Sequence, residues 1–306
     1  MTITSPHKRK DTLTAKVASV GGVQTRVLEG PGSGPTVLLL HGFSDSADGW
    51  RDVLGELAKS GHHGVAVDLP HFGRAGRPRS SSVLAALDEF VEAAAREYDT
   101  GQGVVLVGNS IGGLAALRAA RRTDLPIVSV LAIGPAGLIV PWWMTALTRT
   151  RPLLDRVLTL PSPALVHGTV AGPAIMGNLF ARAVASGHLS ARAKSRYASH
   201  WGPGDLRRQL VLGGQTLAEL ADPHALDNAE FQMPVTLAWG DKDWICSPRA
   251  GARLQQLHPD VRLRSIAGSG HCPQYDNPNV VADLIRKCTG PTTDSTQATD
   301  NKGTTP

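Results

Sequence analysis

The sequence predicts an α/β fold, in which a mostly parallel central sheet carries helices on both faces. Apolar runs of strand length without polar alternation, such as residues 36–42 and 64–70, are typical of strands that are buried on both faces. Segments with helical spacing of apolar residues follow these runs. Strands that alternate with helices pack as a parallel sheet between helical layers. At 306 residues the chain is long enough for one such core with an insertion.

The expected elements follow one another after a polar, flexible tail at residues 1–13. Weak alternation around Gly21 and Gly22 predicts a hairpin over residues 16–30. Apolar runs predict strands at 36–42, 64–70, 103–109, 126–137, 234–243 and 261–268, of which the strand in 126–137 ends in a glycine-proline loop. Helical spacing predicts helices at about 48–60, 82–97, 111–122, 248–257 and 278–288. Residues 289–306 are rich in Thr, Asp, Asn, Gly and Pro, so we expect a disordered tail.

The alternation of strands and helices stops between residues 138 and 230. This stretch has no strand pattern, so we expect a helical insertion that divides the core into residues 14–137 and 231–288. The uncharged run 157–181 is long enough to span a bilayer, but its prolines and glycines disfavour a helix. We therefore expect no transmembrane span, while peripheral contact between the insertion and a membrane surface stays open.

Composition excludes several classes of function. The three cysteines, Cys246, Cys272 and Cys288, have no paired spacing, so we expect neither a disulfide framework nor a zinc site. A reducing, cytoplasmic compartment follows, because the N-terminus also lacks the apolar segment of a secretory signal. The net charge of +5 is scattered without a stripe of basic and aromatic residues, so nucleic acid is not an expected partner. We expect no cofactor and no metal, and the sequence indicates no oligomeric state.

A serine framed by glycines follows the predicted strand 103–109. The stretch Gly108-Asn109-Ser110-Ile111-Gly112 matches G-x-S-x-G, in which a sharp turn projects the serine hydroxyl above the edge of a sheet. Glycine and serine are common in ordinary loops, so the motif alone is weak. An apolar strand precedes it and a helical pattern follows it, as the motif requires. The sequence therefore predicts that Ser110 is a nucleophile.

A serine nucleophile needs a base and an acid to orient that base. Of the 11 histidines, His271 is the best placed, because it directly follows the last predicted strand. The preceding strand ends in "GDKD", which offers Asp241 and Asp243. The order Ser, Asp, His is the one that this triad takes on such a sheet. We favour Asp243, which lies further into the loop, and regard Asp241 as a turn residue.

The negative charge that develops during acyl transfer needs backbone donors. One should be the N–H of the residue after the nucleophile, here Ile111. The other should come from the loop after the strand 36–42, where Phe43 is the candidate. His41 closes that strand, and we expect it to pack beneath the loop without titrating during turnover.

These motifs, taken in order, make the chain resemble an α/β-hydrolase fold enzyme with a cap. The resemblance covers residues 14–288 and rests on "HGF", "DLPHFGRAGRP", "GNSIGG", "GDKD" and "GHCPQYDNP". It implies a helical cap, residues 138–230, inserted after the sixth strand, and it supports Asp243 as the acid. Relatives usually have glycine at the position of His71 and often serine at that of Ala75. We expect His71 to be an exposed loop residue, with a position at the mouth of the pocket as the alternative.

The serine excludes relatives that open epoxides or remove halides, since those use an aspartate nucleophile. Asn109 resembles the residue found in hydrolases that cleave carbon–carbon bonds of aromatic ring-fission products. Such hydrolases tend to carry a tryptophan after the base histidine, where this chain has Cys272. We therefore expect ester hydrolysis first and carbon–carbon hydrolysis second. A slow, receptor-like binding protein on the same fold is the third alternative.

The insertion should set specificity, because cap side chains line the entrance to such sites. Its apolar residues favour a small hydrophobic ester as the substrate, although ordinary packing of the insertion on its base explains them as well. The candidate pocket residues are Asn109, Trp142, Trp143, Met144 and Trp244.

Overall fold

The computed structural model describes residues 13–139, 173–187, 189–201, 205–222 and 230–290. Its strands are β1 (Thr14–Val20), β2 (Val23–Gly30), β3 (Ser33–Leu40), β4 (His62–Val67), β5 (Val104–Asn109), β6 (Ile127–Ile133), β7 (Val235–Gly240) and β8 (Arg262–Ile266). The helices of the core are the 3-10 helix η1 (Ala47–Trp50), α1 (Arg51–Lys59), α2 (Val83–Glu97), α3 (Ile111–Ala119), α10 (Arg249–Leu257), α11 (Pro273–Asp276) and α12 (Pro278–Thr289). Between β6 and β7 lie α7 (Pro173–Ala183), α8 (Ala191–Ala198) and α9 (Asp205–Leu220), which we call the inserted helices.

The strands form one sheet in the order β1-β2-β4-β3-β5-β6-β7-β8. β1 and β2 pair antiparallel, as do β2 and β4, and every other neighbouring pair is parallel. Because parallel strands place their carboxyl ends at one edge, the loops after β3, β5, β6, β7 and β8 come together there. The mostly parallel sheet that the sequence predicts is confirmed.

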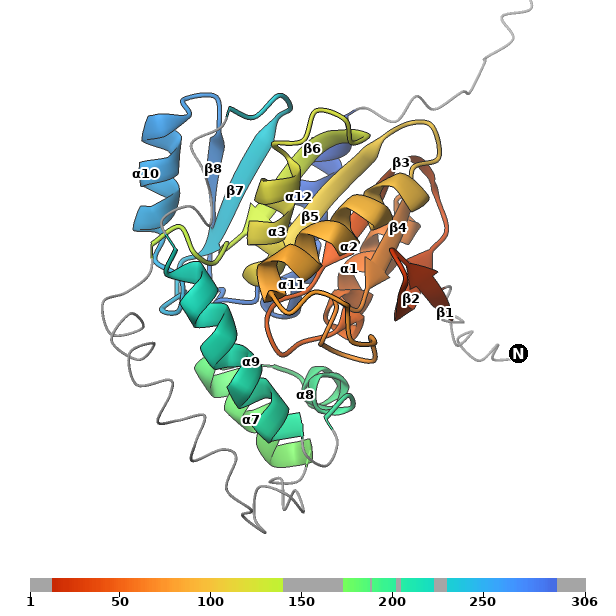
Figure 1. The fold of residues 1–306 in the computed structure, drawn as a ribbon. Helices are drawn as coiled ribbons and strands as arrows, with labels where there is room; N and C mark the ends of the chain where they lie inside the picture. The colour runs from red at the N-terminus through yellow and green to blue at the C-terminus, as the bar shows by residue number, and fades with distance from the viewer. Residues whose placement is uncertain (1–12, 140–172, 188, 202–204, 223–229, 291–306) are drawn as a thin grey trace, which may run out of the picture.

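Helices cover both faces of the sheet, with α2 and α3 in front of it and α12 behind it in Figure 1. β5 shows why an uninterrupted apolar run is needed. Val104 and Leu106 join the hydrophobic cluster that contains α2 and α3, whereas Val105 and Val107 join the cluster that contains α1 and α12. Successive side chains of a strand point to opposite faces, so a strand between two helical layers is apolar at every position.

The inserted helices pack against the carboxyl edge of the sheet, below it in Figure 1. Phe180 of α7 stacks on Tyr197 of α8 with ring centroids 3.8 Å apart, and it meets Tyr275 of α11 edge-on at 5.1 Å. The His271 N–H also donates to the Val184 carbonyl at 2.8 Å. The insertion therefore contacts the loop that carries the predicted base.

The structure contains one helix that the sequence did not predict, and it agrees with the expected end of β6. The short helix α11 directly after His271 was not predicted, because a four-residue helix that begins at Pro273 has too few positions to show a period. Strand β6 ends at Ile133, directly before the glycine-proline loop in which the predicted strand was expected to end, and Gly134 has a φ of +50° that ends the extended conformation. Apart from Leu13, Thr289 and Gly290, the two predicted tails lie outside the described residues.

Candidate active site

Ser110 stands between β5 and α3 in a strained backbone conformation. Its φ of 54° and ψ of −116° are rare for a residue with a Cβ atom. Three hydrogen bonds hold the turn: Ser110 N–H donates to Ile133 O at 2.9 Å, and Ser110 O accepts from the N–H groups of Leu114 at 2.9 Å and Ala136 at 3.1 Å. The hydroxyl-bearing side chain is thereby fixed at the carboxyl edge of the sheet, with 9% of the residue's surface exposed.

The two glycines that frame the motif are required by close backbone approach. A Cβ atom on Gly108 would lie 2.1 Å from the Gly112 carbonyl oxygen. One on Gly112 would lie 2.5 Å from the His41 carbonyl oxygen and 2.6 Å from that of Leu40. Neither position tolerates a side chain without moving a backbone, so the tight turn depends on both glycines.

His271 and Asp243 form a buried pair at the neighbouring strand ends. His271 follows β8, Asp243 follows β7, and the imidazole Nδ1 lies 2.8 Å from the carboxylate Oδ2. Both residues are buried. A Cβ atom on Gly134, after β6, would lie 2.9 Å from Asp243 Oδ2 and 3.3 Å from His271 Nδ1. The pair therefore fills the space that this glycine leaves open.

The loop after β7 separates its two aspartates. Asp243 Oδ1 accepts from the N–H groups of Ile245 at 2.9 Å and Cys246 at 3.0 Å, whereas the Asp241 side chain is exposed. These two bonds curl the loop so that Ile245 and Cys246 face inward. Trp244, which the sequence suggested as a pocket residue, is instead 69% exposed and does not line the pocket described below.

The loop after β3 approaches the serine. A Cβ atom on Gly42 would lie 3.4 Å from Ser110 Cβ, and Phe43 lines the same pocket as Ser110. His41 is fully buried at the base of this loop. Its Nε2 accepts from the Leu69 N–H at 2.9 Å and its Nδ1 donates to the Gly42 carbonyl at 2.7 Å, so the ring is neutral. Burial lowers the pKa of His41 to about 4.

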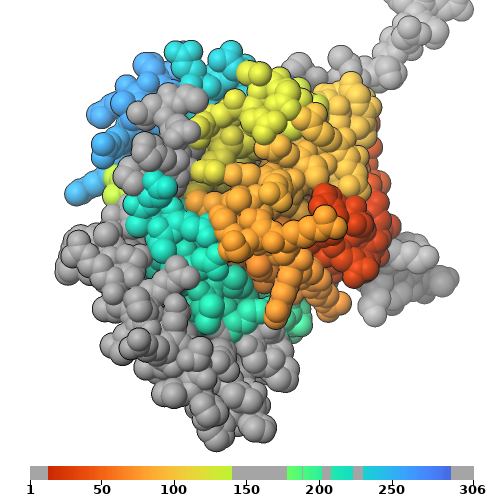
Figure 2. Space-filling model, in the orientation of Figure 1, coloured from red at the N-terminus to blue at the C-terminus, as the bar shows by residue number. Residues whose placement is uncertain are grey.

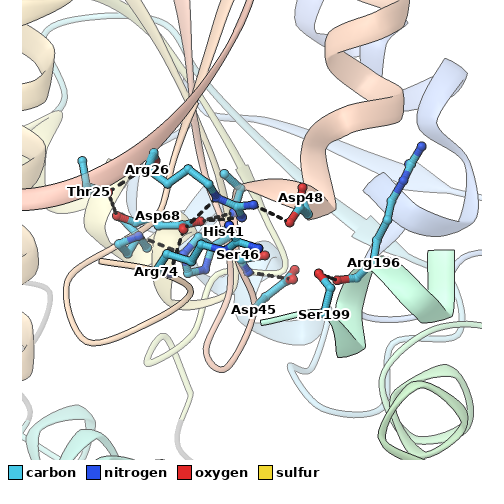
Figure 3. Close-up of polar contacts among 12 residues, drawn as sticks. Thr25, Arg26, His41, Asp45, Ser46, Asp48, Asp68, Arg74, Arg196 and Ser199 are labelled. Carbon is cyan, nitrogen blue, oxygen red and sulfur yellow. Dashed lines mark hydrogen bonds and ion pairs between the residues drawn. The ribbon is translucent and has the colours of Figure 1, made fainter. Parts of the chain in front are cut away.

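A buried ion cluster supports the same loop (Figure 3). Asp68, after β4, accepts from Arg26 Nε at 3.1 Å and from the N–H groups of Ala47 at 2.7 Å and Arg74 at 2.8 Å. Arg26 also donates to Asp48 at 2.7 Å. Burial disfavours the guanidinium charge, but the two carboxylates outweigh it and raise the pKa of Arg26. A charged residue buried this deeply is expected to be paired in this way.

A second contact ties this loop to the histidine loop. Tyr275 Oη and the Ser46 N–H both donate to Asp45 Oδ1 at 2.8 Å. Among the described residues, Asp45 Oδ2 is buried without a hydrogen-bond partner. Burial raises the pKa of Asp45 to about 7. Neither residue was singled out from the sequence, because nothing short-range links Asp45 to a tyrosine 230 residues away.

Asn109 does not line the pocket described below, contrary to its place among the predicted pocket residues. Its side chain is fully buried, and Nδ2 donates to His271 O at 2.8 Å and to Ile133 O at 3.2 Å. Its Oδ1 accepts from Gln274 Nε2 at 3.1 Å and lies 3.4 Å from Cys272 Sγ. The amide therefore links the serine turn to the histidine loop.

His71 has a φ of 74°, in the left-handed region that favours glycine. Its side chain is half-buried, so the exposed position that we expected is wrong. Burial and the nearby Arg208 and Arg77 lower the pKa of His71. Trp142, Trp143 and Met144 lie outside the described residues, so their predicted places in the pocket stay predictions.

An apolar pocket of about 250 Å³ opens beside Ser110. Among the described residues it is lined by Phe43, Ser110, Ile111, Ala136, Gly137, Ile139, Gly213, Thr216, Leu217, Leu220, Ile245 and Cys246. The predicted nucleophile and the two residues whose N–H groups were predicted to bind the oxyanion therefore border one cavity. The α9 residues were missed, although their spacing of three and four residues is a helical signal.

The chain belongs to the alpha/beta hydrolase fold family, whose sequence profile matches residues 35–278. An uncharacterized protein of Mycobacterium tuberculosis is 26% identical over 277 residues, with 84% of this chain and 75% of that protein covered. An esterase of the same organism is 27% identical over 261 residues, with 83% of each chain covered.

Two further similarities bear on function and fold. A 2-hydroxy-6-oxo-6-(2'-aminophenyl)hexa-2,4-dienoic acid hydrolase of Metapseudomonas resinovorans is 31% identical over 141 residues, covering 44% of this chain and 47% of that protein. The crystal structure of a bacterial membrane phospholipase A superposes with a TM-score of 0.66 at 23% identity, covering 91% of this chain and 86% of the other. At that identity the likeness shows the fold alone. Within the described ranges of this chain, every helix is too short or too polar to cross a membrane.

Proposed function

We propose that this protein is a serine hydrolase that cleaves carboxylic esters with an apolar acyl group through an acyl-enzyme. The observation that carries the proposal is the buried 2.8 Å contact between His271 and Asp243, which follow strands of the same parallel sheet as Ser110. An imidazole held through Nδ1 by a carboxylate presents Nε2 as the proton acceptor. The family membership and the esterase relative support the same reaction class.

In the proposed mechanism, Ser110 Oγ attacks the carbonyl carbon of the ester and its proton passes to His271 Nε2. The carbonyl oxygen becomes an oxyanion, which the N–H groups of Ile111 and Phe43 stabilise. The carbon–oxygen bond to the alcohol then breaks, and His271 returns the proton to the leaving oxygen. Water repeats the sequence on the acyl-enzyme and releases the acid. Asp243 holds the imidazole orientation and stabilises its cationic form throughout.

The test of this proposal is the hydrolysis of p-nitrophenyl butyrate by the wild type and by a Ser110→Ala variant. We expect turnover by the wild type, a burst that reports the acyl-enzyme, and a loss of about 10⁶-fold in kcat for the variant. A phosphonate ester should label the wild type at Ser110 and leave the variant unlabelled. Equal turnover by both proteins, or none by the wild type, would remove the serine-hydrolase function.

A second candidate function is the hydrolysis of a carbon–carbon bond in a ring-fission product. It is favoured by the sequence resemblance at Asn109, although that side chain does not line the pocket, and by the partial similarity to the Metapseudomonas resinovorans enzyme, whose named substrate is a dienoic acid. Such an acid is an anion at neutral pH, and a buried carboxylate needs a cationic or hydrogen-bonding partner. The described lining of the pocket beside Ser110 holds no cationic residue, which favours the ester. Faster bleaching of a dienoate than hydrolysis of any ester would reverse this order.

A further inference from the structure

One face of α9 forms a wall of the pocket beside Ser110. Gly213, Thr216, Leu217 and Leu220 line the pocket, and they recur at the spacing of three, four and seven residues that places side chains on one helical face. Core residues, among them Phe43 and Ile111, line the other walls of the same cavity. The shape of the pocket is therefore set jointly by the core and by the inserted helices.

Away from Ser110 and the predicted oxyanion donors, the described lining offers no polar partner. It carries no charged side chain, and the Thr216 hydroxyl already donates to the Leu212 carbonyl at 2.7 Å within its own helix. A charged or strongly polar group in that part of the pocket would lose its water without gaining a partner. The pocket is suited to an uncharged hydrocarbon group.

The position of the base decides which end of an ester enters this pocket. This inference rests on the proposed function. In that function, His271 must reach the leaving oxygen to protonate it. His271 does not line the pocket, whereas Ile111 and Phe43 do. The alcohol therefore lies on the side of the histidine, and the acyl chain extends into the pocket.

The α9 wall is anchored to the core through Glu219. The Glu219 carboxylate accepts from the N–H groups of Val83 at 3.0 Å and Leu84 at 2.8 Å and from Ser82 Oγ at 3.0 Å, at the N-terminus of α2. A carboxylate at this place satisfies helix N–H groups that have no partner within the helix, and it favours the positive end of the helix dipole. In Figure 2 the surface of α9, in teal, lies against the orange surface that contains α2.

Gly213 lies next to Phe43 of the predicted oxyanion loop. A Cβ atom built there would lie 3.4 Å from Phe43 Cζ, which is ordinary contact, and any larger side chain would extend into the cavity. The next residue, Gly214, is the opposite case, because a Cβ atom there meets no atom within 4 Å. Substitutions at Gly213 and Gly214 can therefore be compared, because the first changes both the pocket and the helix and the second changes the helix alone.

We propose that the substrates are esters of short to medium, uncharged acyl chains, and that Gly213 sets the longest chain that the pocket accepts. At about 30 Å³ for a group the size of a water molecule, a cavity of about 250 Å³ corresponds to about eight methylene-sized groups. Acetyl to octanoyl chains match this size, and a palmitoyl chain is about twice as long.

The test compares p-nitrophenyl acetate, butyrate, octanoate and palmitate with the wild type and with Gly213→Ala, Gly213→Leu and Gly214→Ala variants. For the wild type, kcat/KM should peak at butyrate or octanoate and fall for palmitate. Gly213→Leu should lower kcat/KM for octanoate about tenfold or more relative to acetate, and Gly213→Ala should act in the same direction with a smaller effect. Gly214→Ala should keep the wild-type profile. Both alanine variants replace a glycine within a helix, so neither should weaken the fold.

Each result has a distinct meaning. A chain-length profile that Gly213→Leu leaves unchanged, while the wild type still depends on Ser110, overturns the role of Gly213 alone. A shift that appears in a series of alkyl acetates instead of the acyl series overturns the placement of the acyl chain. An equal shift in Gly213→Ala and Gly214→Ala assigns the effect to the helix and contradicts the proposal. Ser110-independent turnover removes the proposed function and this inference together.

Discussion

Two buried histidines at the carboxyl edge of the sheet, His41 and His271, and two buried aspartates there, Asp45 and Asp243, have different surroundings. Both oxygens of Asp243 are satisfied, one by His271 and one by two backbone N–H groups. Asp45 has one satisfied oxygen and one buried oxygen without a partner among the described residues. His41 uses both ring nitrogens on backbone groups, whereas the Nδ1 atom of His271 meets a carboxylate. Histidine and aspartate therefore have two uses at this edge. His271 and Asp243 form a pair suited to proton transfer, whereas His41 and Asp45 each hold a loop through backbone and tyrosine contacts.

The largest effect is expected when Asp243, the acid of the predicted catalytic pair, is changed, and it should fall on catalysis. Asp243→Asn should lower kcat about 10⁴-fold, because an amide favours the wrong imidazole tautomer. Asp241→Asn, on the same loop but exposed, should keep kcat within a few-fold of the wild type. Steady-state kinetics on p-nitrophenyl butyrate, with circular dichroism to confirm folding, checks both variants. Equal losses in the two variants would mean that Asp243 is not the acid.

The next effect concerns stability and pH at Asp45. A carboxyl whose pKa is raised to about 7 in the folded protein destabilises the fold as the pH rises from the unfolded value of 3.8 toward 7. Asp45→Asn removes this penalty and keeps an oxygen that can accept from Tyr275. As the pH rises across this range, the free energy of unfolding of the variant should therefore increase relative to that of the wild type, by up to about 4 kcal/mol. Urea unfolding at several pH values measures the difference. A difference that stays constant with pH contradicts the assignment.

The smallest effect has the opposite pH dependence and comes from His41. Its pKa is lowered from 6.5 to about 4, so its contribution to stability is present above pH 6.5 and is lost as the pH falls toward 4. His41→Leu leaves the Leu69 N–H without its acceptor and should cost about 1–3 kcal/mol at pH 7. The difference in the free energy of unfolding between the wild type and the variant should become smaller as the pH falls. A difference that grows below pH 6 would mean that His41 is charged in the folded protein.

The sheet and the order of the chemical residues were predictable from the sequence because both depend on short-range patterns. Uninterrupted apolar runs such as Val104 to Val107 indicate burial on both faces, and G-x-S-x-G followed by acid and base loops places three groups at one edge. The three inserted helices that the structure describes also lie where the alternation stops. The roles of Ser110, Asp243 and His271 stay predictions for the experiments above.

What the sequence could not predict depends on contacts between distant segments. The contact between Asp45 and Tyr275 and the capping of α2 by Glu219 join residues more than a hundred positions apart. The direction of a side chain in a loop was equally hidden. Trp244 points outward because two backbone N–H groups beside it bind Asp243, and a propensity for apolar burial cannot anticipate that geometry.

The carboxylate of Glu219 gives the molecule a built-in reporter of motion. Any movement that carries α9 away from the core removes the partners of the Val83 and Leu84 amides at the start of α2. Hydrogen exchange at those two amides therefore measures how often this wall leaves its place. If release of product requires α9 to move, the rate of its opening sets an upper limit on turnover, and exchange at these amides reports that rate under conditions in which every opening leads to exchange.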